Sequence, residues 1–157
     1  MQDFVHLHVH TQYSLLDGQA SVARLVDKAM KNGMKGIAVT DHGNMFGIKE
    51  FTNYVNKKNS GPKGEVKDLK KRIAGIEAGT IECEDKEAEI AACKAKIVEA
   101  ENKLFKPIIG CEMYVARRTM DLKEGKPDQS GYHLIVLAKN ETGYHNLIKL
   151  VSHAWTR

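Results

Sequence analysis

The segment Phe4–Thr11 alternates apolar and polar residues, and this alternation constrains the fold more than any other feature of the chain. A period of two predicts a half-buried β-strand with the apolar residues on one face. The other face then carries three histidines, His6, His8 and His10. Imidazoles repel one another when protonated, whereas a divalent cation binds several neutral imidazoles together. The segment therefore predicts a strand that presents metal ligands. A solvent-facing strand with incidental histidines is the alternative.

The next fifty residues continue as alternating helices and short apolar strands. Ser21 is a favourable N-cap for a helix with apolar residues at spacings of three and four, and Asn32–Gly33 is a typical helix end. The apolar run Gly36–Thr40 is typical of a buried parallel strand, and an amphipathic helix around Ile48–Val55 follows it. The order β-α-β-α favours parallel strands connected by helices.

Residues 56–106 interrupt this pattern. The stretch 59–64 contains Gly and Pro, which predicts a linker. Beyond it, two series of apolar residues with helical spacing flank a turn at Gly79–Thr80, and Lys and Glu fill the other positions. We expect two antiparallel helices that form an insertion at 56–106. A solvated hairpin without chemistry is the first interpretation, and an arm that docks a partner is the alternative.

Two further strands carry ionisable residues. After its first residue, the run Lys106–Val115 is apolar except for Glu112, and His133–Ala138 begins with a histidine. A long polar loop at Arg117–Gly131 separates them, and an amphipathic helix follows the second. We expect four parallel strands in an α/β fold that belongs to a longer protein.

The candidate site residues follow from this arrangement, because ligands bind at the carboxyl ends of parallel strands. Four strands and the first loop supply them: His8, His10, Asp17, Asp41, His42, Glu112 and His133. A buried carboxylate at Glu112 requires a cation or a hydrogen-bond donor. A mixed set of imidazoles and carboxylates suits two or three Zn, Mn or Fe ions that share a bridging carboxylate. Such clusters hydrolyse phosphoesters.

Charge and composition exclude some classes of protein. The net charge of +4, with both signs mixed along 157 residues, is compatible with a nucleic-acid partner without requiring one. The chain has no apolar run of about 18 residues, so we expect no membrane span, and its start lacks the layout of a secretory signal. Three cysteines without CxxC spacing favour a reducing, cytoplasmic setting over disulfides or a Cys-type zinc site.

Several motifs resemble those of the PHP (polymerase and histidinol phosphatase) superfamily of metal-dependent phosphoesterases. They are His8-Val9-His10-Thr11, Asp17-Gly18, Thr40-Asp41-His42-Gly43, Gly110-Cys111-Glu112 and His133-Leu134. The residues that flank them are similar to the start of the catalytic alpha subunits of bacterial DNA polymerase III. The resemblance covers the chain except for residues 56–106.

The resemblance implies a distorted (β/α)7 barrel with up to three metals at the carboxyl ends of its strands, incomplete in this chain. By motif, it assigns His8 and His10 to a first metal, Glu112 as a bridge to a second that His133 also binds, and Asp17 and His42 to a third. Asp41 would orient these ligands. The remaining ligands of the family lie beyond Arg157, so we expect this part of the chain to be inactive alone.

For the whole protein, the resemblance implies DNA-directed DNA synthesis in the bacterial cytoplasm, with Mg at a polymerase site outside this chain. The expected partners are DNA, a proofreading subunit and a sliding clamp, and the domain itself is a candidate 3′→5′ exonuclease. One alternative is a non-catalytic scaffold, braced by metals, that docks the proofreading subunit. Another is a free-standing phosphatase of the histidinol phosphatase type. We expect His6, His145 and His153 to lie outside the site.

Overall fold

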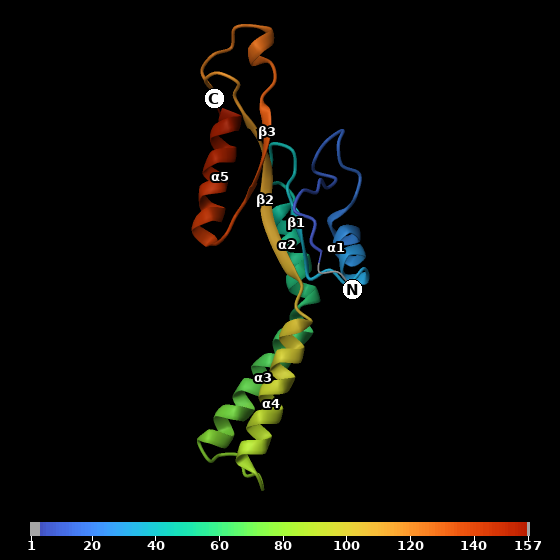
Figure 1. The fold of residues 1–157 in the computed structure, drawn as a ribbon, viewed down its shortest axis with the longest axis vertical. Coiled ribbons are helices and arrows are strands. Elements are labelled where there is room, and N and C mark those ends of the chain that lie inside the picture. Colours follow the sequence, from blue (N-terminus) through green and yellow to red (C-terminus); the bar gives the residue numbers. More distant parts are fainter. Residues whose placement is uncertain (1–3, 157) are drawn as a thin grey trace. The chain divides into compact units, whose positions relative to one another are not determined.

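The computed structural model describes residues 4–156 and divides into two compact units (Figure 1). Unit 1 combines the chain up to Tyr54 with the chain from Lys106 onward, and unit 2 is Val55–Phe105. All candidate site residues belong to unit 1.

Unit 1 contains a mixed sheet of three strands in the order β1-β2-β3. Strands β1 (Gly36–Val39) and β2 (Lys106–Val115) are parallel, as predicted. Strand β3 (Tyr132–Leu137) is antiparallel to β2, so the prediction of four parallel strands is wrong. The reason is the connection, because a parallel pair needs a long crossover, usually a helix. Residues 116–131 contain only the short 3₁₀ helix Lys126–Asp128.

The predicted strand at Phe4–Thr11 is also wrong, although the segment does run beside β1. Ala38 N donates to His6 O and Thr40 N donates to Val9 O, both at 2.9 Å. The donors Ala38 and Thr40 are two residues apart, but the acceptors His6 and Val9 are three residues apart. A regular ladder of hydrogen bonds needs the same spacing on both strands. The extra residue falls at a bend of Leu7 and His8, which redirects the side chains as a bulge does. Among residues 4–156, a closed barrel is not formed, and the distorted barrel stays a prediction.

Three helices accompany this sheet, and local sequence signals explain the first of them. Helix α1 (Val22–Lys31) has the predicted N-cap, since Ser21 Oγ accepts from Arg24 N at 3.4 Å. It ends before Gly33, whose φ of 77° is the left-handed conformation that glycine favours. Helix α2 (Ile48–Lys58) follows β1, and α5 (Glu141–Thr156) follows β3.

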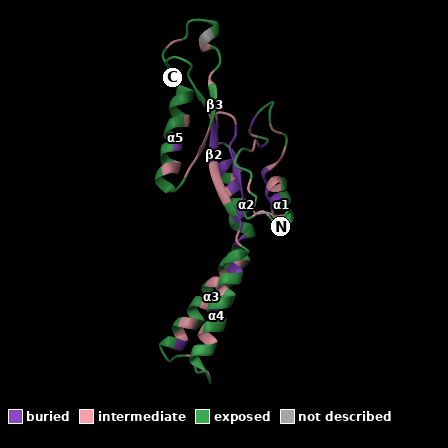
Figure 2. Ribbon diagram, viewed as in Figure 1, coloured by how far each residue is buried: buried purple, intermediate pink, exposed green. Residues whose placement is uncertain are grey.

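The core of unit 1 lies between the sheet and these helices. Figure 2 shows buried residues on β1 and in the middle of β2. The largest buried apolar side chains of the helices include Val22, Val26, Phe51 and Leu147. Among the described helices, none is both long and apolar enough to cross a membrane.

Unit 2 consists mainly of α3 (Ser60–Glu77) and α4 (Lys86–Asn102), which pack against each other. The predicted linker at 59–64 is wrong, because these residues begin α3. Pro62 lies in the first turn, where a helix tolerates proline because its missing N–H would have no helical acceptor. The side-chain amide of Asn59 donates to Phe105 O at 2.8 Å and accepts from Phe105 N at 2.9 Å. These bonds join the two ends of unit 2. The interpretation of residues 56–106 as an insertion stays a prediction.

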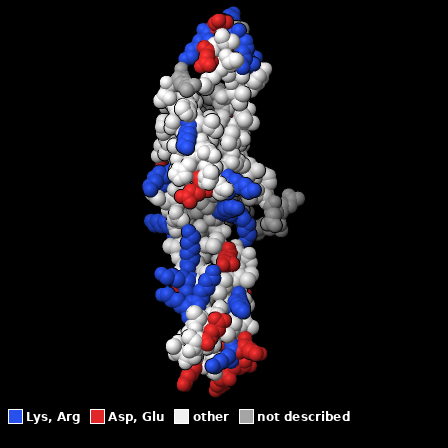
Figure 3. Space-filling view, turned by 90° about the vertical axis from the view of Figure 1, so that its left-hand side faces the viewer, with Lys and Arg blue, Asp and Glu red and all other residues white. Residues whose placement is uncertain are grey.

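Charge is segregated along unit 2. Residues 57–72 contain seven Lys and Arg and two Asp and Glu, whereas residues 77–89 contain six acidic residues and one Lys. Figure 3 shows acidic side chains gathered at the end where the α3–α4 loop lies, with basic ones further along the helices.

Candidate metal centre

Glu112 lies at the centre of the site and is only 2% exposed. Backbone bonds connect its strand to the loop after β1: Glu112 N donates to Asp41 O at 3.1 Å, and Gly43 N donates to Glu112 O at 2.9 Å. These bonds bring His42 beside Glu112 in a short parallel bridge.

Four imidazoles surround the carboxylate of Glu112. Its Oε2 atom lies 2.5 Å from His10 Nε2 and 3.4 Å from His8 Nε2. The same oxygen lies 3.3 Å from His42 Nδ1, and Oε1 contacts His133 Nδ1. The result is two groups of possible ligands, His8–His10–Glu112 and His42–Glu112–His133, with the ligand atoms of each within 4.8 Å of one another. Glu112 belongs to both groups.

The antiparallel direction of β3 explains how His133 reaches this carboxylate. The register pairs Tyr114 with His133 and Glu112 with Ile135. Directly paired residues share a face of the sheet, as do residues two apart, so His133 and Glu112 lie diagonally on one face. A histidine at the start of a parallel strand would lie at the opposite edge of the sheet.

Asp17 lies at the solvent side of the site. Its Oδ2 atom is 3.6 Å from His42 Nδ1, and its side chain is 46% exposed. The structure thus brings Asp17 and His42 together, as the motif assignment has them. His42 is also within reach of Glu112 and His133, a grouping that the sequence alone did not predict. Among the described residues, His6 belongs to neither group, and its ring contacts Phe4.

Asp41 is buried beneath the ligands and bonds the loop that carries them. Its Oδ1 atom accepts from Thr11 N at 2.6 Å and from Ser14 Oγ at 2.8 Å, and Oδ2 accepts from Thr11 Oγ1 at 2.9 Å. Ser14 Oγ also accepts from His42 N at 3.0 Å. Asp41 therefore positions the chain on both sides of the site, between His10 and Asp17. Sequence reasoning missed Thr11, which lies within a motif, and Ser14, which lies between two motifs.

The electrostatics of the centre favour an ionised Glu112. Burial acts to raise the pKa of the carboxyl, but hydrogen bonds from His42, His10 and His8 outweigh burial and hold the pKa below its ordinary value. Cys111 offers no thiolate, since burial and the nearby Asp41 raise the pKa of its thiol to about 11.

The donor set fits divalent cations. His8 Nε2 and His10 Nε2 lie 3.2 Å apart, and both face the carboxylate. Two protonated imidazoles at that distance repel each other, whereas a cation between neutral imidazoles and a carboxylate satisfies all three groups.

Tyr114 is a further member of the site that the sequence analysis missed. Its ring lies edge-on to His42 and His133, with centroid distances of 4.6 and 5.1 Å. The available signal was its position two residues after Glu112, because alternate residues of a strand share a face.

Residues 6–99 and 86–157 of the chain match the family model of the PHP domain. The chain belongs to the PHP domain family. The resemblance that the motifs predict is thereby confirmed, and the α/β architecture of unit 1 is consistent with it.

Several curated relatives of this PHP domain carry the name DNA polymerase III subunit alpha. The protein of Treponema pallidum is 40% identical over 153 residues, which are 97% of this chain and 9% of the relative. That of Borreliella burgdorferi is 41% identical over 152 residues, 95% of this chain and 9% of the relative. That of Aquifex aeolicus is 32% identical over 160 residues, which are 98% of this chain and 10% of the relative. The chain thus spans about a tenth of the length of these relatives.

Replacement of residues 60–104 by a short Gly-Ser linker is expected to leave the metal content of this PHP domain unchanged. The reason is that every candidate ligand lies in unit 1, and loop closure depends weakly on the length of a flexible connection. Elemental analysis of the protein before and after replacement measures this. Loss of metal would mean that the helical pair supports the site.

Proposed function

We propose that this PHP domain belongs to the catalytic subunit of a bacterial replicative DNA polymerase and that its metal centre hydrolyses phosphodiester bonds at DNA 3′ ends. The observation that carries the proposal is the position of Glu112, a buried carboxylate shared by two groups of histidines. The names of the relatives support the polymerase context.

The residues that would hold the ions follow from the two groups. His8, His10 and Glu112 would hold one divalent ion, and His42, Glu112 and His133 a second. Asp17, beside His42, is the candidate for a third. Bound Zn, Mn or Fe would supply positive charge to phosphoryl oxygens and lower the pKa of a water molecule.

The protein side chains prepare this site for an anionic substrate. The pKa of Glu112 lies below its ordinary value, so its carboxylate is ionised and can bind a cation together with the histidines around it. The side chains of His8 and His133 are each about half exposed, so a phosphodiester can approach from solvent. Asp41, through Thr11 and Ser14, keeps the ligand loop in place before substrate arrives.

Within the whole protein, we place this domain beside a Mg-dependent polymerase site and among DNA, a proofreading subunit and a sliding clamp in the cytoplasm. In the scaffold alternative, the domain binds the metals but does not hydrolyse phosphodiesters. The segregated charge of unit 2 favours it as the second candidate, because a charged arm can dock another subunit. A free-standing small-molecule phosphatase fits less well with the names of the relatives.

His10→Ala and His133→Ala test the proposal, because each removes a ligand from one group only. In the full-length protein, each variant is expected to lose about one equivalent of metal and at least about tenfold in 3′→5′ hydrolysis of single-stranded DNA. His153→Ala, on α5, is the matched control and should change neither quantity.

The measurements are elemental analysis and hydrolysis of an end-labelled oligonucleotide with added Zn, Mn or Fe. A wild-type protein with its full metal content but no hydrolysis would reject the catalytic role and leave the scaffold. Unchanged metal in both variants would reject the ligand assignment.

A further inference from the structure

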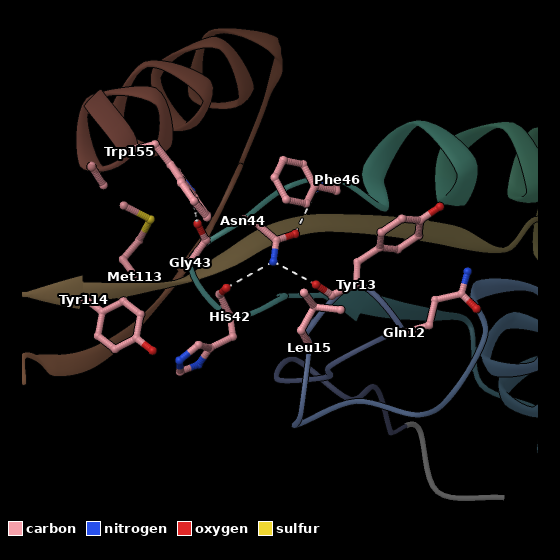
Figure 4. Close-up of a pocket in the computed structure, with 11 residues that line it drawn as sticks. Gln12, Tyr13, Leu15, His42, Gly43, Asn44, Phe46, Met113, Tyr114 and Trp155 are labelled. Carbon is pink, nitrogen blue, oxygen red and sulfur yellow. Dashed lines mark hydrogen bonds between the residues drawn. The ribbon is translucent and has the colours of Figure 1, made fainter. Parts of the chain in front are cut away.

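A cavity of about 540 Å³ lies next to the metal centre in unit 1. Four aromatic side chains, Tyr13, Phe46, Tyr114 and Trp155, line it together with His42 (Figure 4). We call it the aromatic cavity. His42 and Tyr114 border both this cavity and the ligand groups, so the two sites are continuous.

The walls of the aromatic cavity expose large apolar side chains to water. Phe46 and Trp155 are each 66% exposed, and Leu15 is 83% exposed. The Phe46 and Trp155 rings lie with their centroids 6.2 Å apart at an interplanar angle of 45°. A contiguous exposed apolar surface of this kind marks a binding site more often than an ordinary protein surface does.

The polar groups of the loop at the cavity already have partners. Asn44 Nδ2 donates to Tyr13 O at 3.0 Å and to His42 O at 3.1 Å, and its Oδ1 accepts from Phe46 N at 3.1 Å. Trp155 Nε1 donates to Gly43 O at 2.8 Å. The loop is therefore held in place, and what remains for a ligand is mainly aromatic surface.

These features favour a flat aromatic ligand that is bound by stacking. Nucleobases stack on aromatic side chains with little dependence on sequence, because every base has a π face. The volume lies within the range of small-molecule sites. A nucleotide joins a base and a phosphate by one sugar, and the aromatic cavity and the ligand groups are likewise neighbours that share His42 and Tyr114.

We propose that the aromatic cavity binds the nucleobase of the nucleotide whose phosphodiester lies at the metal centre. The proposal rests on the proposed function for the phosphate, and on Phe46 and Trp155 for the base. The cavity then acts as a subsite that selects nucleic acid ends bearing a base over other phosphodiesters.

The first test uses full-length protein and two single-stranded oligonucleotides that differ only in the 3′-terminal residue, which either carries a base or is abasic. The wild type is expected to show a KM about tenfold lower for the substrate with the base, a typical effect of one stacked base. Trp155→Ala and Phe46→Ala should each reduce this ratio toward one, because each removes an aromatic ring on which the base stacks. Leu150→Ala, similarly exposed on the same helix but outside the cavity, should keep the wild-type ratio.

The second test does not need hydrolysis. Trp155 is the single tryptophan of this chain, and the fluorescence difference between wild-type and Trp155→Phe protein isolates its signal. Titration with dAMP should quench that signal, and titration with deoxyribose 5-phosphate, which lacks the base, should not.

Quenching by dAMP without any hydrolysis would reject the proposed function and keep the nucleobase subsite. Hydrolysis with no quenching, and with the wild-type KM ratio in both alanine variants, would reject the subsite and keep the proposed function. The latter result would mean that another segment of the protein covers Phe46 and Trp155. Because the Phe46 side chain is mostly exposed, its variant remains informative if Trp155→Ala fails to fold.

Discussion

Replacing Glu112 by glutamine is expected to empty both groups of the metal centre and to lower phosphodiester hydrolysis by at least about 100-fold. Changes to residues that only support a ligand cost about 10–100-fold in metal affinity or activity, so the loss of a ligand shared by two groups should reach or exceed that range. The expected loss is larger than that of His10→Ala or His133→Ala, because each of those leaves the other group intact.

The physical reason is the charge and the two oxygens of the carboxylate. Oε2 faces His8, His10 and His42, whereas Oε1 contacts His133, so one carboxylate can serve ions on either side. Glutamine keeps the shape but is neutral, and its NH₂ group offers no lone pair to an ion. Both groups should therefore lose affinity together.

Metal content by elemental analysis, hydrolysis and nucleotide polymerisation should be measured on the same preparations. Polymerisation is expected to persist largely unchanged, since the polymerase site lies outside this chain in the proposed function. Glu141→Gln is the matched control, because that carboxylate is 89% exposed on α5 and should affect no measurement. A Glu112→Gln protein with its full metal complement would contradict the bridging role.

Short-range signals explain the parts of the fold that the sequence predicts correctly. The boundaries of α1 follow from the Ser21 cap and from the left-handed Gly33, both of which act within one helical turn. Strand β1 is apolar throughout because it is buried throughout. The bounds of β2 match the run Lys106–Val115, in which Glu112 is the one charged residue after Lys106 and marks the site.

The errors occur where long-range geometry outweighs local pattern. The alternation at Phe4–Thr11 is that of a strand, but pairing with β1 requires a bend at Leu7 and His8 that no local residue preference encodes. At 59–64, glycine and proline suggested a linker, yet proline is acceptable in the first turn of α3. The direction of β3 was accessible in principle, because a polar connection without helical periodicity does not suit a parallel crossover.

The sequence predicts the types of ligand at the site but not all the distances between them. Strand ends and motifs point to His8, His10, Glu112 and His133, and the structure brings these four together. The contact of His42 with Glu112 depends on the backbone bridge between β2 and the loop after β1, which a motif does not reveal. The supporting hydroxyls of Thr11 and Ser14 carry no ligand chemistry of their own and become visible only through Asp41.

Asp41→Ala is expected to release the loop between His10 and Asp17 from the body of unit 1. The carboxylate of Asp41 is 1% exposed and accepts three hydrogen bonds, two from Thr11 and one from Ser14. A buried donor left without its partner costs about 1–3 kcal/mol. Three such donors, even with partial rearrangement, should lower the local free energy of unfolding by roughly 3 kcal/mol.

Hydrogen–deuterium exchange of the full-length protein measures this locally, without requiring two-state unfolding of a multidomain chain. A change of about 3 kcal/mol corresponds to roughly 100-fold faster exchange, expected in peptides that contain Thr11 and His42. Metal affinity should fall about 10–100-fold in the same variant, because the loop carries His10 and Asp17.

Asp17→Asn separates positioning from ligation. Its side chain is about half exposed and 3.6 Å from His42 Nδ1, so the exchange of the loop should remain unchanged while metal binding weakens.

Asp41→Asn should give an intermediate result, since an amide keeps one oxygen acceptor for Thr11 N and Ser14 Oγ but loses the charge that strengthens both bonds. If Asp41→Ala leaves both exchange and metal affinity at wild-type values, the loop is held by the backbone alone and Asp41 is not a positioning residue.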